Sequence, residues 1–566
     1  MTSGTNTHKT LNDLFDTSCR EYATRPCLSM AMEEPLTYGD IEKKVQAMSS
    51  ALYASGVKKK DKIAILAENS PNWGIAYLSL IRLGATVVPI LPDFTGTDVR
   101  HILTNSKVEI VFTTKRQIDK ILDLQNHKIE KIITLDDSKP HSELSSLTTL
   151  SDFLSQSEQL PEKKRAKLHA LTQEIDENDL ASIIYTSGTS GHSKAVMLSH
   201  RNLLSNVQAA AQLVNITPEW TFLSILPMSH TYEFTIGFLL PLYNGCRITY
   251  AGKSPTPRIL EQICKHEKPT AMCIVPMVME KIYKKRVMTA VEHSTLLTMA
   301  VKVNFLRQIL FQKIGKKLLD FFGGNLELLA IGGAAINIDT EKFLREAKFP
   351  YIIGYGLTET SPLLAGGPLN DPTIELGSTG KPVPGVEIRI TSPDPETGIG
   401  AIMARGPNIM QGYYNMPEAT AETIDKDGWL ATGDLGNFDP QGNLHIKGRS
   451  KSVIVLAHGE NIYPEAIEEK INCNMYVMES LVMENNERLE ARIYLDYDLI
   501  DQETKGKSNE KQKEFINKIL LEIQQTVNSQ LPTYSKVHTF IERQEPFIKT
   551  ATHKIKRYLY TSRSEV

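Results

Sequence analysis

The sequence predicts an α/β protein with a large N-terminal domain and a small, mobile α+β domain at the C-terminus. Over the first 130 residues, short apolar runs alternate with amphipathic segments, which is typical of parallel α/β subdomains whose helices cover the sheet faces. At 375–449, glycine and proline become frequent and short strands alternate with turns, which predicts a β-rich subdomain. We therefore expect a large domain at 1–449 and a small domain at 450–566.

Periodicity predicts the individual elements. Ile41, Val45, Met48 and Leu52 recur at intervals of three to four residues, which indicates a helix with one apolar face. In the large domain we also expect strands at 62–66, 85–90, 108–112, 181–185 and 386–390, and helices at 73–83 and 98–104. The polar stretch 137–180 is interpreted as a linker or surface excursion.

In the small domain, helices are expected at 464–471 and 510–527, with strands between them. The charged stretch 501–512 is expected to be an exposed loop.

Composition excludes several classes of protein. The 566 residues carry a net charge of −3, which argues against a general nucleic-acid binder. The six cysteines include no CxxC pair, so neither a zinc cluster nor a disulfide framework is indicated. The N-terminus has no signal-peptide core, and the longest apolar stretch, 234–243, has about half the length that crosses a bilayer. We expect a soluble, cytoplasmic protein.

The strongest motif is Tyr-Thr-Ser-Gly-Thr-Ser-Gly-His-Ser-Lys at 185–194, between an expected strand and a helix expected near Ser199. Backbone N–H groups around glycines, with hydroxyl and ammonium groups, can close on a phosphate. The spacing from Gly188 to Lys194, followed by Ala195, differs from a Walker A loop. The alternative is a Ser/Gly surface turn. The candidate phosphate-binding residues are Thr186, Ser187, Gly188, Thr189, Ser190, Gly191 and Lys194.

A second motif, at 354–361, places Tyr355 between Gly354 and Gly356 and is followed by Thr358 and Glu359. An aromatic ring flanked by glycines offers an open face on which a nucleotide base can stack. A carboxylate four residues further on can hold Mg²⁺ together with substrate phosphates. The alternative is a plain turn after a buried strand.

Two further segments are ambiguous by themselves. Asp434 follows Thr432 and Gly433, where an aspartate is usually a turn former. The basic segment 546–557, which contains Lys554, has the composition of a solvated tail.

These segments occur in order over nearly the whole chain, and together they resemble the adenylate-forming superfamily, which includes acyl-CoA synthetases, luciferases and peptide-synthetase adenylation domains. In the family's first motif a proline commonly precedes the lysine, where this chain has Ser193. The resemblance implies that Tyr355 stacks on adenine, Thr358 contacts phosphate and Glu359 carries Mg²⁺. It also implies ATP, CoA and Mg²⁺ as cosubstrates and cofactor.

The resemblance implies further roles along the chain. Asp434 would bind both ribose hydroxyls, and Arg449 would contact ribose or phosphate. Lys451 would be the hinge of the small domain, and Gly459 would line the CoA tunnel. Lys554 would reach the reacting carboxylate; His553 stands before it where glycine is commoner, so Lys549 and Lys556 are alternatives in register. The segment in which adenine and the acyl chain meet would contain Gly333 and Ala334.

The segment 226–234 resembles long-chain fatty acyl-CoA synthetases and lacks the Phe-Asp pair of amino-acid-activating relatives. His230 would lie near the acyl carbonyl or gate the acyl tunnel; the alternative is a structural histidine. The implied function is ATP-dependent conversion of a medium- or long-chain fatty acid to acyl-AMP and then acyl-CoA. Two alternatives remain open: a ligase acting on acyl carrier protein or stopping at acyl-AMP, and a non-catalytic nucleotide-binding relative.

The stretch 281–320 carries nine Lys and Arg residues against Glu292 and Asp320, with apolar residues at helical spacing. One interpretation is core-facing helices with solvated basic faces. The other is a peripheral membrane contact that supplies a lipid substrate.

Overall fold

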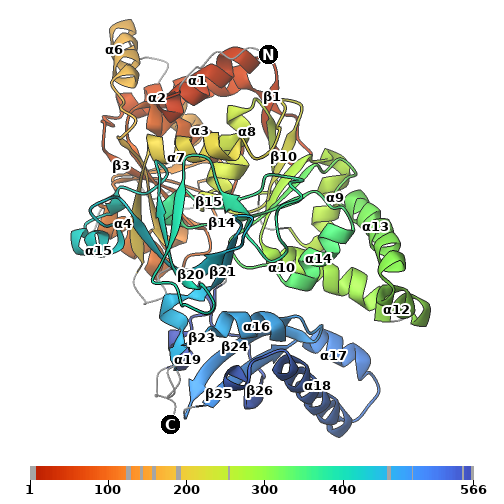
Figure 1. The fold of residues 1–566 in the computed structure, drawn as a ribbon. Coiled ribbons are helices and arrows are strands. Elements are labelled where there is room, and N and C mark those ends of the chain that lie inside the picture. Colours follow the sequence, from red (N-terminus) through yellow and green to blue (C-terminus); the bar gives the residue numbers. More distant parts are fainter. Residues whose placement is uncertain are drawn as a thin grey trace.

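A computed structural model describes ten segments of the chain, which are residues 8–122, 129–139, 145–155, 161–186, 193–252, 255–292, 294–455, 461–486, 488–550 and 554–561. Figure 1 shows a large α/β body above a smaller C-terminal domain, with the β-rich strands β20 (Leu430–Phe438) and β21 (Leu444–Arg449) leading from one to the other. The predicted fold class is confirmed, while the division of the chain at residue 449 stays a prediction. Within the described residues, no helix combines the length and apolar character needed to cross a membrane.

The first sheet of the large domain has eight strands in the order β19-β9-β8-β4-β3-β5-β6-β7. The strands are β3 (Lys62–Leu66), β4 (Thr86–Ile90), β5 (Ile110–Thr113), β6 (Lys131–Thr134), β7 (Leu147–Thr149), β8 (Leu180–Thr186), β9 (Lys194–Ser199) and β19 (Gly412–Tyr413). The strands from β8 to β7 are parallel, whereas β9 and β19 run antiparallel to their neighbours.

The second sheet has nine strands in the order β16-β15-β14-β13-β12-β10-β11-β1-β2. The strands are β1 (Pro26–Met30), β2 (Leu36–Thr37), β10 (Thr221–Ser224), β11 (Arg247–Tyr250), β12 (Ala271–Ile274), β13 (Leu328–Ile331), β14 (Tyr351–Gly356), β15 (Leu363–Gly366) and β16 (Lys381–Pro382). From β14 to β1 the pairing is parallel, so the carboxyl ends of several strands meet at one edge.

The large domain contains helices between and around the two sheets and at its edge. They are α1 (Leu11–Tyr22), α2 (Tyr38–Ala54), α3 (Pro71–Arg82), α4 (Gly96–Ser106), α5 (Leu150–Ser155), α6 (Glu162–Gln173), α7 (His200–Ala210), α8 (Leu240–Tyr243), α9 (Pro257–Glu267), α10 (Pro276–Ile282), α11 (Thr289–Glu292), α12 (Thr295–Lys302), α13 (Asn304–Phe321), α14 (Ile338–Glu346) and α15 (Pro417–Thr423). Two π-helical segments, η2 (Glu233–Leu239) and η3 (Tyr283–Met288), precede α8 and α11.

Helix α3 lies between the two sheets, in contact with β3 and β4 of one and β1 of the other. Its residues from Trp73 to Ile81 are all buried, because apolar strands face it from both sides. Phe234 packs against Trp73 and Tyr77, with ring centroids 6.0 Å and 4.4 Å apart. Ser70 accepts a hydrogen bond from the Trp73 amide and caps the helix.

The expectation that 137–180 is a linker or surface excursion is wrong, because its described residues form regular elements. It contributes β7 to the first sheet, and α5 and α6 lie within it. Strand β7 spans only three residues, too few to show a periodic pattern within a polar segment.

The β-rich stretch forms a four-stranded antiparallel sheet, with β17 (Glu387–Thr391), β18 (Gly400–Arg405), β20 and β21 side by side in that order. Two short strands of the same stretch join other sheets, since β16 extends the second sheet and β19 the first. The β-rich segment therefore bridges both α/β sheets.

The small domain packs three strands, β24 (Val477–Asn485), β25 (Arg488–Leu495) and β26 (Thr539–Arg543), against α16 (Pro464–Asn472) and α18 (Asn509–Ser529). Strands β22 (Ile454–Val455) and β23 (Asn461–Ile462) precede them, and α19 (Tyr558–Thr561) follows. The expected loop at 501–512 is wrong at both ends, because α17 (Tyr497–Glu503) and α18 extend into it. Ser508 caps α18, which allows the helix to begin within a charged segment.

Lys284 of η3 joins the large domain to the small one. Its ammonium donates hydrogen bonds to the backbone carbonyl oxygens of Asn472, Asn474 and Val477, at 2.8, 3.1 and 3.0 Å. These carbonyls lie at and beyond the C-terminal end of α16, where a cation also complements the helix dipole. Burial lowers the pKa of Lys284, so the contact is largely shielded from water.

Gly74 provides a test of the packing between the sheets. A Cβ atom at this position would lie 2.9 Å from the ring of Phe238, so we expect Gly74→Ala to destabilise the fold by about 1–3 kcal/mol. Urea titration measures the free energy of unfolding. In a Phe238→Leu background the same substitution should cost markedly less. An equal cost in both backgrounds would contradict contact with the ring as its cause.

Candidate functional site

A cavity of about 2600 Å³ opens between the two domains. The ends of β8, β13, β14, β20 and β21 line it from the large domain, and residues near the C-terminus line it from the small domain. The lining includes twelve predicted site residues of the large domain, which are Thr186, Lys194, His230, Gly333, Ala334, Gly354, Tyr355, Gly356, Thr358, Glu359, Asp434 and Arg449. The hinge candidate Lys451 and the candidate catalytic Lys554 line the same cavity.

Asp434 is the buried centre of one wall. The hydroxyl of Tyr355 donates to its Oδ2 at 2.7 Å, and Nε of Arg449 lies 3.1 Å from its Oδ1. Asp434 and Arg449 are paired residues of the antiparallel β20–β21 ladder, so their side chains meet by register. Burial and the Asp434 charge raise the pKa of the Tyr355 hydroxyl, which therefore remains a donor. The predicted base-stacking and ribose-binding residues thus form one hydrogen-bonded group.

The turn after β14 presents Glu359 to the cavity. A Cβ atom on Gly356 would lie 1.8 Å from the carbonyl oxygen of Pro362, so only glycine permits this close approach. The 3-10 turn at Thr358–Thr360 follows directly and carries the predicted phosphate and metal residues. Because Tyr355, Thr358 and Glu359 all line the cavity, the structure supports the interpretation of the motif as a site rather than a plain turn.

Tyr413 is a site residue that the sequence analysis missed. Its hydroxyl donates to Oε1 of Glu359 at 2.9 Å, and the ammonium of Lys194 lies 4.3 Å from the centre of its ring. Tyr413 belongs to β19, which pairs with β9 two residues beyond Lys194. No local pattern marks Tyr413, because its position depends on pairing between segments more than 200 residues apart.

The first motif differs from its expected surroundings. Strands β8 and β9 form an antiparallel pair in which Thr186 faces Lys194, and α7 begins only after Ser199. The connection is therefore strand to strand, because 194–199 extends the sheet before the helix begins. The predicted residues Ser187, Gly188, Thr189, Ser190 and Gly191 lie outside the described residues, as does the CoA-tunnel candidate Gly459.

Lys554 brings a cation from the small domain into the cavity. Surrounding protein and the repulsion of Arg449 lower the pKa of its ammonium, while Asp434 and Glu359 oppose the shift. The two alternatives in register lie elsewhere. Lys549 is ion-paired with Glu479, and neither Lys549 nor Lys556 is among the described residues lining the cavity. The geometry therefore favours Lys554.

Two titratable groups that precede α8, His230 and Glu233, line the cavity. Burial, aided by the positive charge of Lys554, lowers the pKa of His230 to about 4, so its imidazole is neutral at pH 7. Burial raises the pKa of Glu233 to about 8, so this carboxyl is mostly protonated at pH 7. The carboxyl of Glu233 lies over Gly237, where a Cβ atom would meet its Oε1 at 2.6 Å. Glu233 was not singled out from the sequence.

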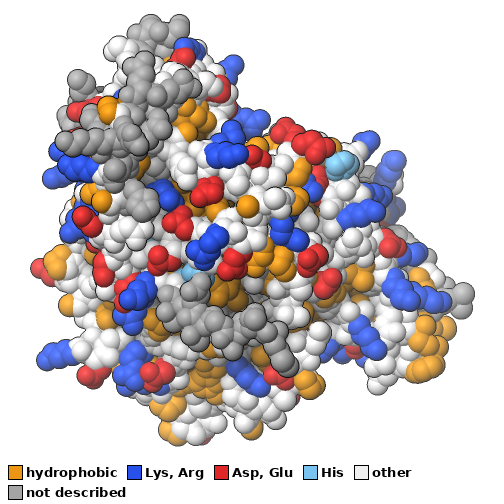
Figure 2. All heavy atoms as spheres, turned by 90° about the horizontal axis from the view of Figure 1, so that it is seen from above, with side chains coloured by type: hydrophobic (Ala, Val, Ile, Leu, Met, Phe, Trp, Pro, Cys, Tyr) orange, Lys and Arg blue, Asp and Glu red, His pale blue; other side chains and the backbone are white. Residues whose placement is uncertain are grey.

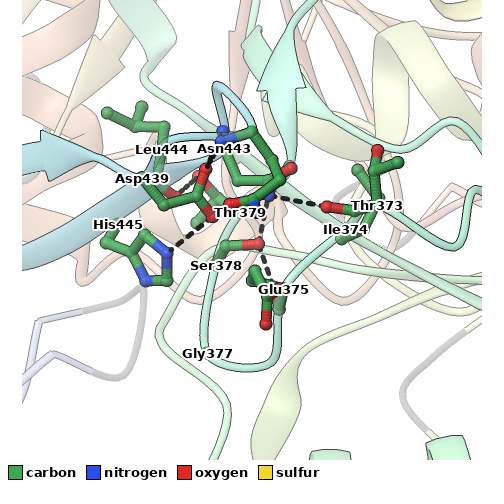
Figure 3. A network of polar contacts seen from close by, with 12 residues as sticks. Thr373, Ile374, Glu375, Gly377, Ser378, Thr379, Asp439, Asn443, Leu444 and His445 are labelled. Atoms are coloured by element: carbon green, nitrogen blue, oxygen red, sulfur yellow. Dashed lines mark hydrogen bonds and ion pairs between the residues drawn. The ribbon is translucent and has the colours of Figure 1, made fainter.

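A polar network joins the turn between β20 and β21 to the 373–379 segment (Figure 3). Asn443 donates to the carbonyl oxygen of Thr373 at 2.8 Å and to Oδ2 of Asp439 at 2.7 Å. The amide of Thr379 donates to the carbonyl oxygen of Leu444 at 2.8 Å. His445 also points to Asp439, 3.4 Å away. These bonds fix the β20–β21 turn against the 373–380 segment, which in turn fixes the strands that carry Asp434 and Arg449.

The donor set suits a magnesium ion that is shared with a substrate. Among the described residues, no three His, Cys, Asp or Glu side chains gather as a ready metal cluster. The Tyr413 hydroxyl bonds to only one of the two carboxylate oxygens of Glu359, its Oε1. Since Mg²⁺ commonly takes one or two carboxylates plus substrate phosphates and water, a single carboxylate in this cavity fits the ion.

The cleft combines an aromatic ring, a buried carboxylate that can accept hydrogen bonds from ribose hydroxyls, and several cations. Such a cleft is suited to bind a nucleotide. The model of the AMP-binding enzyme family matches residues 15–414, and that of the AMP-binding enzyme C-terminal domain matches 451–563. The chain belongs to the AMP-binding enzyme family, whose members form adenylates.

Curated relatives cover most of this chain. The long-chain-fatty-acid–CoA ligase heimdall of Drosophila melanogaster is 29% identical over 522 residues, covering 85% of this chain and 75% of that protein. A 3-[(3aS,4S,7aS)-7a-methyl-1,5-dioxo-octahydro-1H-inden-4-yl]propanoyl:CoA ligase of Rhodococcus jostii (strain RHA1) is 27% identical over 456 residues, covering 79% and 81%. These matches support adenylate-forming acid–CoA ligase activity.

Solved structures show the same fold. ATP-bound MatB from Rhodopseudomonas palustris superposes with a TM-score of 0.75 at 22% identity, covering 97% of this chain and 98% of that one. The anthranilate CoA ligase AuaEII in complex with anthranoyl-AMP gives a TM-score of 0.76 at 17% identity, covering 97% and 96%.

Tyr413 can be tested without disturbing its ring. Tyr413→Phe removes the donor to Glu359, and because a hydrogen bond to a charged group contributes about 1.5–3 kcal/mol, we expect pyrophosphate exchange to fall roughly 10- to 100-fold. The Mg²⁺ concentration for half-maximal rate should also rise. Tyr414→Phe, one residue on, is the matched control. Equal rates in the two variants would show that the Tyr413 hydroxyl has no part in positioning Glu359.

Proposed function

We propose that the chain uses ATP and Mg²⁺ to convert a medium- or long-chain fatty acid to acyl-AMP, and then passes the acyl group to CoA. The observation that carries the proposal is the shared cavity, where Lys554 of the small domain faces Glu359, Asp434 and Arg449 of the large domain. This set of residues is intact, which disfavours a non-catalytic relative.

The chemistry follows from charge. The fatty acid carboxylate is ionised near pH 7, so it attacks the α-phosphorus of ATP without a general base. A new C–O–P link forms, the bond to the β-phosphate oxygen breaks, and pyrophosphate leaves. Both reactants are anionic, so Lys194 and Lys554 would offset the charge that gathers in the transition state. The neutral imidazole of His230 would add no charge beside the acyl carbonyl.

The nucleotide would occupy the wall described above. Tyr355 would offer its ring to the adenine, Asp434 would accept from the ribose hydroxyls, and Arg449 would contact ribose or phosphate. Glu359, oriented by Tyr413, would hold Mg²⁺, with Thr358 donating to phosphate. When bound, the ion would neutralise phosphate charge and orient the leaving group.

The thioester step would need a second arrangement of the domains. In the family pattern the small domain rotates at the residue corresponding to Lys451, which withdraws Lys554 and brings the segment containing Gly459 toward the thiol. Lys451 lies in a 3-10 turn directly after β21, with an exposed side chain, so the position is free of packing that would oppose rotation. CoA sulfur would then attack the acyl carbonyl, and AMP would leave.

The long-chain preference rests on the 226–234 segment and on the curated relatives named as long-chain-fatty-acid–CoA ligases. Pyrophosphate exchange over straight-chain acids of graded length, with an aryl and a fused-ring acid included, tests it directly. We expect medium or long chains to give the highest kcat/KM. If kcat/KM is highest for the aryl or fused-ring acid, the proposal that a fatty acid is the substrate is wrong. Parallel thioester assays with CoA and with acyl carrier protein identify the acceptor.

The role of Lys554 can be tested by measuring the two half-reactions, adenylation and thioester formation, separately. Lys554→Ala should lower pyrophosphate exchange by about 100-fold or more, as removal of a charge-stabilising contact typically does, while thioester formation from synthetic acyl-AMP and CoA stays near wild type. Lys556→Ala is the matched control, since Lys556 lies on the same segment outside the cavity lining. If Lys554→Ala slows both half-reactions alike, its proposed role is wrong.

A further inference from the structure

The corner between α12 and α13 exposes large apolar side chains. Phe305 is 70% exposed, Met299 67% and Val303 51%, and Leu306 and Ile309 are exposed beside them. This group of five residues, the apolar tip, lies at the edge of the large domain, where α12 and α13 project away from the sheets (Figure 1). Contiguous apolar surface of this kind marks an interaction site more often than a solvated one.

Helix α13 has two distinct faces. Phe311, Gly315 and Leu318 are buried against the domain core, and Gly315 approaches Ala347 closely. At 100° per residue, the exposed side chains from Phe305 to Lys317 fall within an arc of roughly 180° on the other side. The core-facing interpretation therefore accounts for one face of the helix and leaves the other without a partner.

The outer face is basic as well as apolar. Lys302, Lys313, Lys316 and Lys317 are exposed, and among the described residues no carboxylate lies within ion-pair distance of any of them. Arg307, by contrast, is paired with Glu346 at 2.7 Å. Figure 2 shows hydrophobic side chains next to Lys and Arg side chains at this right-hand edge of the molecule. An apolar tip flanked by uncompensated lysines is complementary to an anionic surface with an apolar interior.

The geometry points to an anionic lipid bilayer as the partner of this face. The apolar tip would enter the boundary between headgroups and acyl chains, while the flexible lysine stems would extend to lipid phosphates. Each lysine near an anionic leaflet strengthens binding by roughly fivefold, and salt screens this part of the attraction. Such docking would hold the enzyme where acids with long alkyl chains partition, but the contact itself requires no turnover.

Vesicle co-sedimentation tests the proposal with the full chain. We expect binding to phosphatidylcholine vesicles that contain phosphatidylglycerol, weaker binding to phosphatidylcholine alone, and a decline as salt rises. Phe305→Ser with Leu306→Ser should abolish the bound fraction, and Lys313→Glu with Lys316→Glu should weaken binding by at least about 20-fold. Adenylation of a water-soluble acid should be unchanged in both double variants, which would show that they fold. Loss of vesicle binding with unchanged adenylation would also distinguish this proposal from the proposed function.

Matched controls lie on α18 of the small domain. Leu521→Ser removes an exposed apolar side chain there, and Lys511→Glu with Lys513→Glu reverses two exposed charges. Neither control should change vesicle binding. The proposal is overturned if the wild type does not bind anionic vesicles, or if the tip variants bind as well as the controls. It is also overturned if sedimentation shows that the wild type and the controls are dimers whereas the tip variants are monomers, since a second copy of the chain would then cover the face.

Discussion

A single buried carboxylate organises the cleft. Asp434 accepts from the Tyr355 hydroxyl and pairs with Arg449, so it joins the end of β14 to the β20–β21 ladder. A carboxylate removed from water must have such partners, and their geometry is consequently fixed. The large domain thus presents a polar wall of defined shape before any ligand arrives, which lowers the ordering cost of binding.

The fold class and most of the cleft could be predicted from local patterns. Strands such as 62–66 and 85–90 are short, apolar and bounded by helices, so periodicity alone identifies them. Tyr355 and Glu359 belong to a compact motif whose residue types indicate their chemistry, whereas the role of Asp434 could be predicted only from the resemblance of the whole set of motifs. The family resemblance favours Lys554 over Lys549, and the structure supports this choice, because Lys554 lines the cavity whereas Lys549 is ion-paired with Glu479.

The residues that could not be predicted depend on contacts distant in sequence. Tyr413 reaches Glu359 because β19 adds to the edge of the first sheet, a pairing that its own neighbours do not signal. Glu233 looks like an ordinary polar residue until the apolar surroundings that keep it protonated are visible. Strand β9 was mistaken for part of a loop-to-helix connection, because a lysine at its first position is also what a phosphate loop requires.

The Lys284 contact has a consequence for how the two domains part. Three backbone carbonyls replace the water around its ammonium, yet the lowered pKa shows that this replacement is incomplete. Rehydration of the cation therefore returns part of the free energy that separation of the domains costs. In the proposed rotation, this contact would hold the small domain in register and could break without a large cost in free energy. An apolar residue at this position would gain no hydration energy on exposure, so hydrophobic contact would only oppose the proposed rotation.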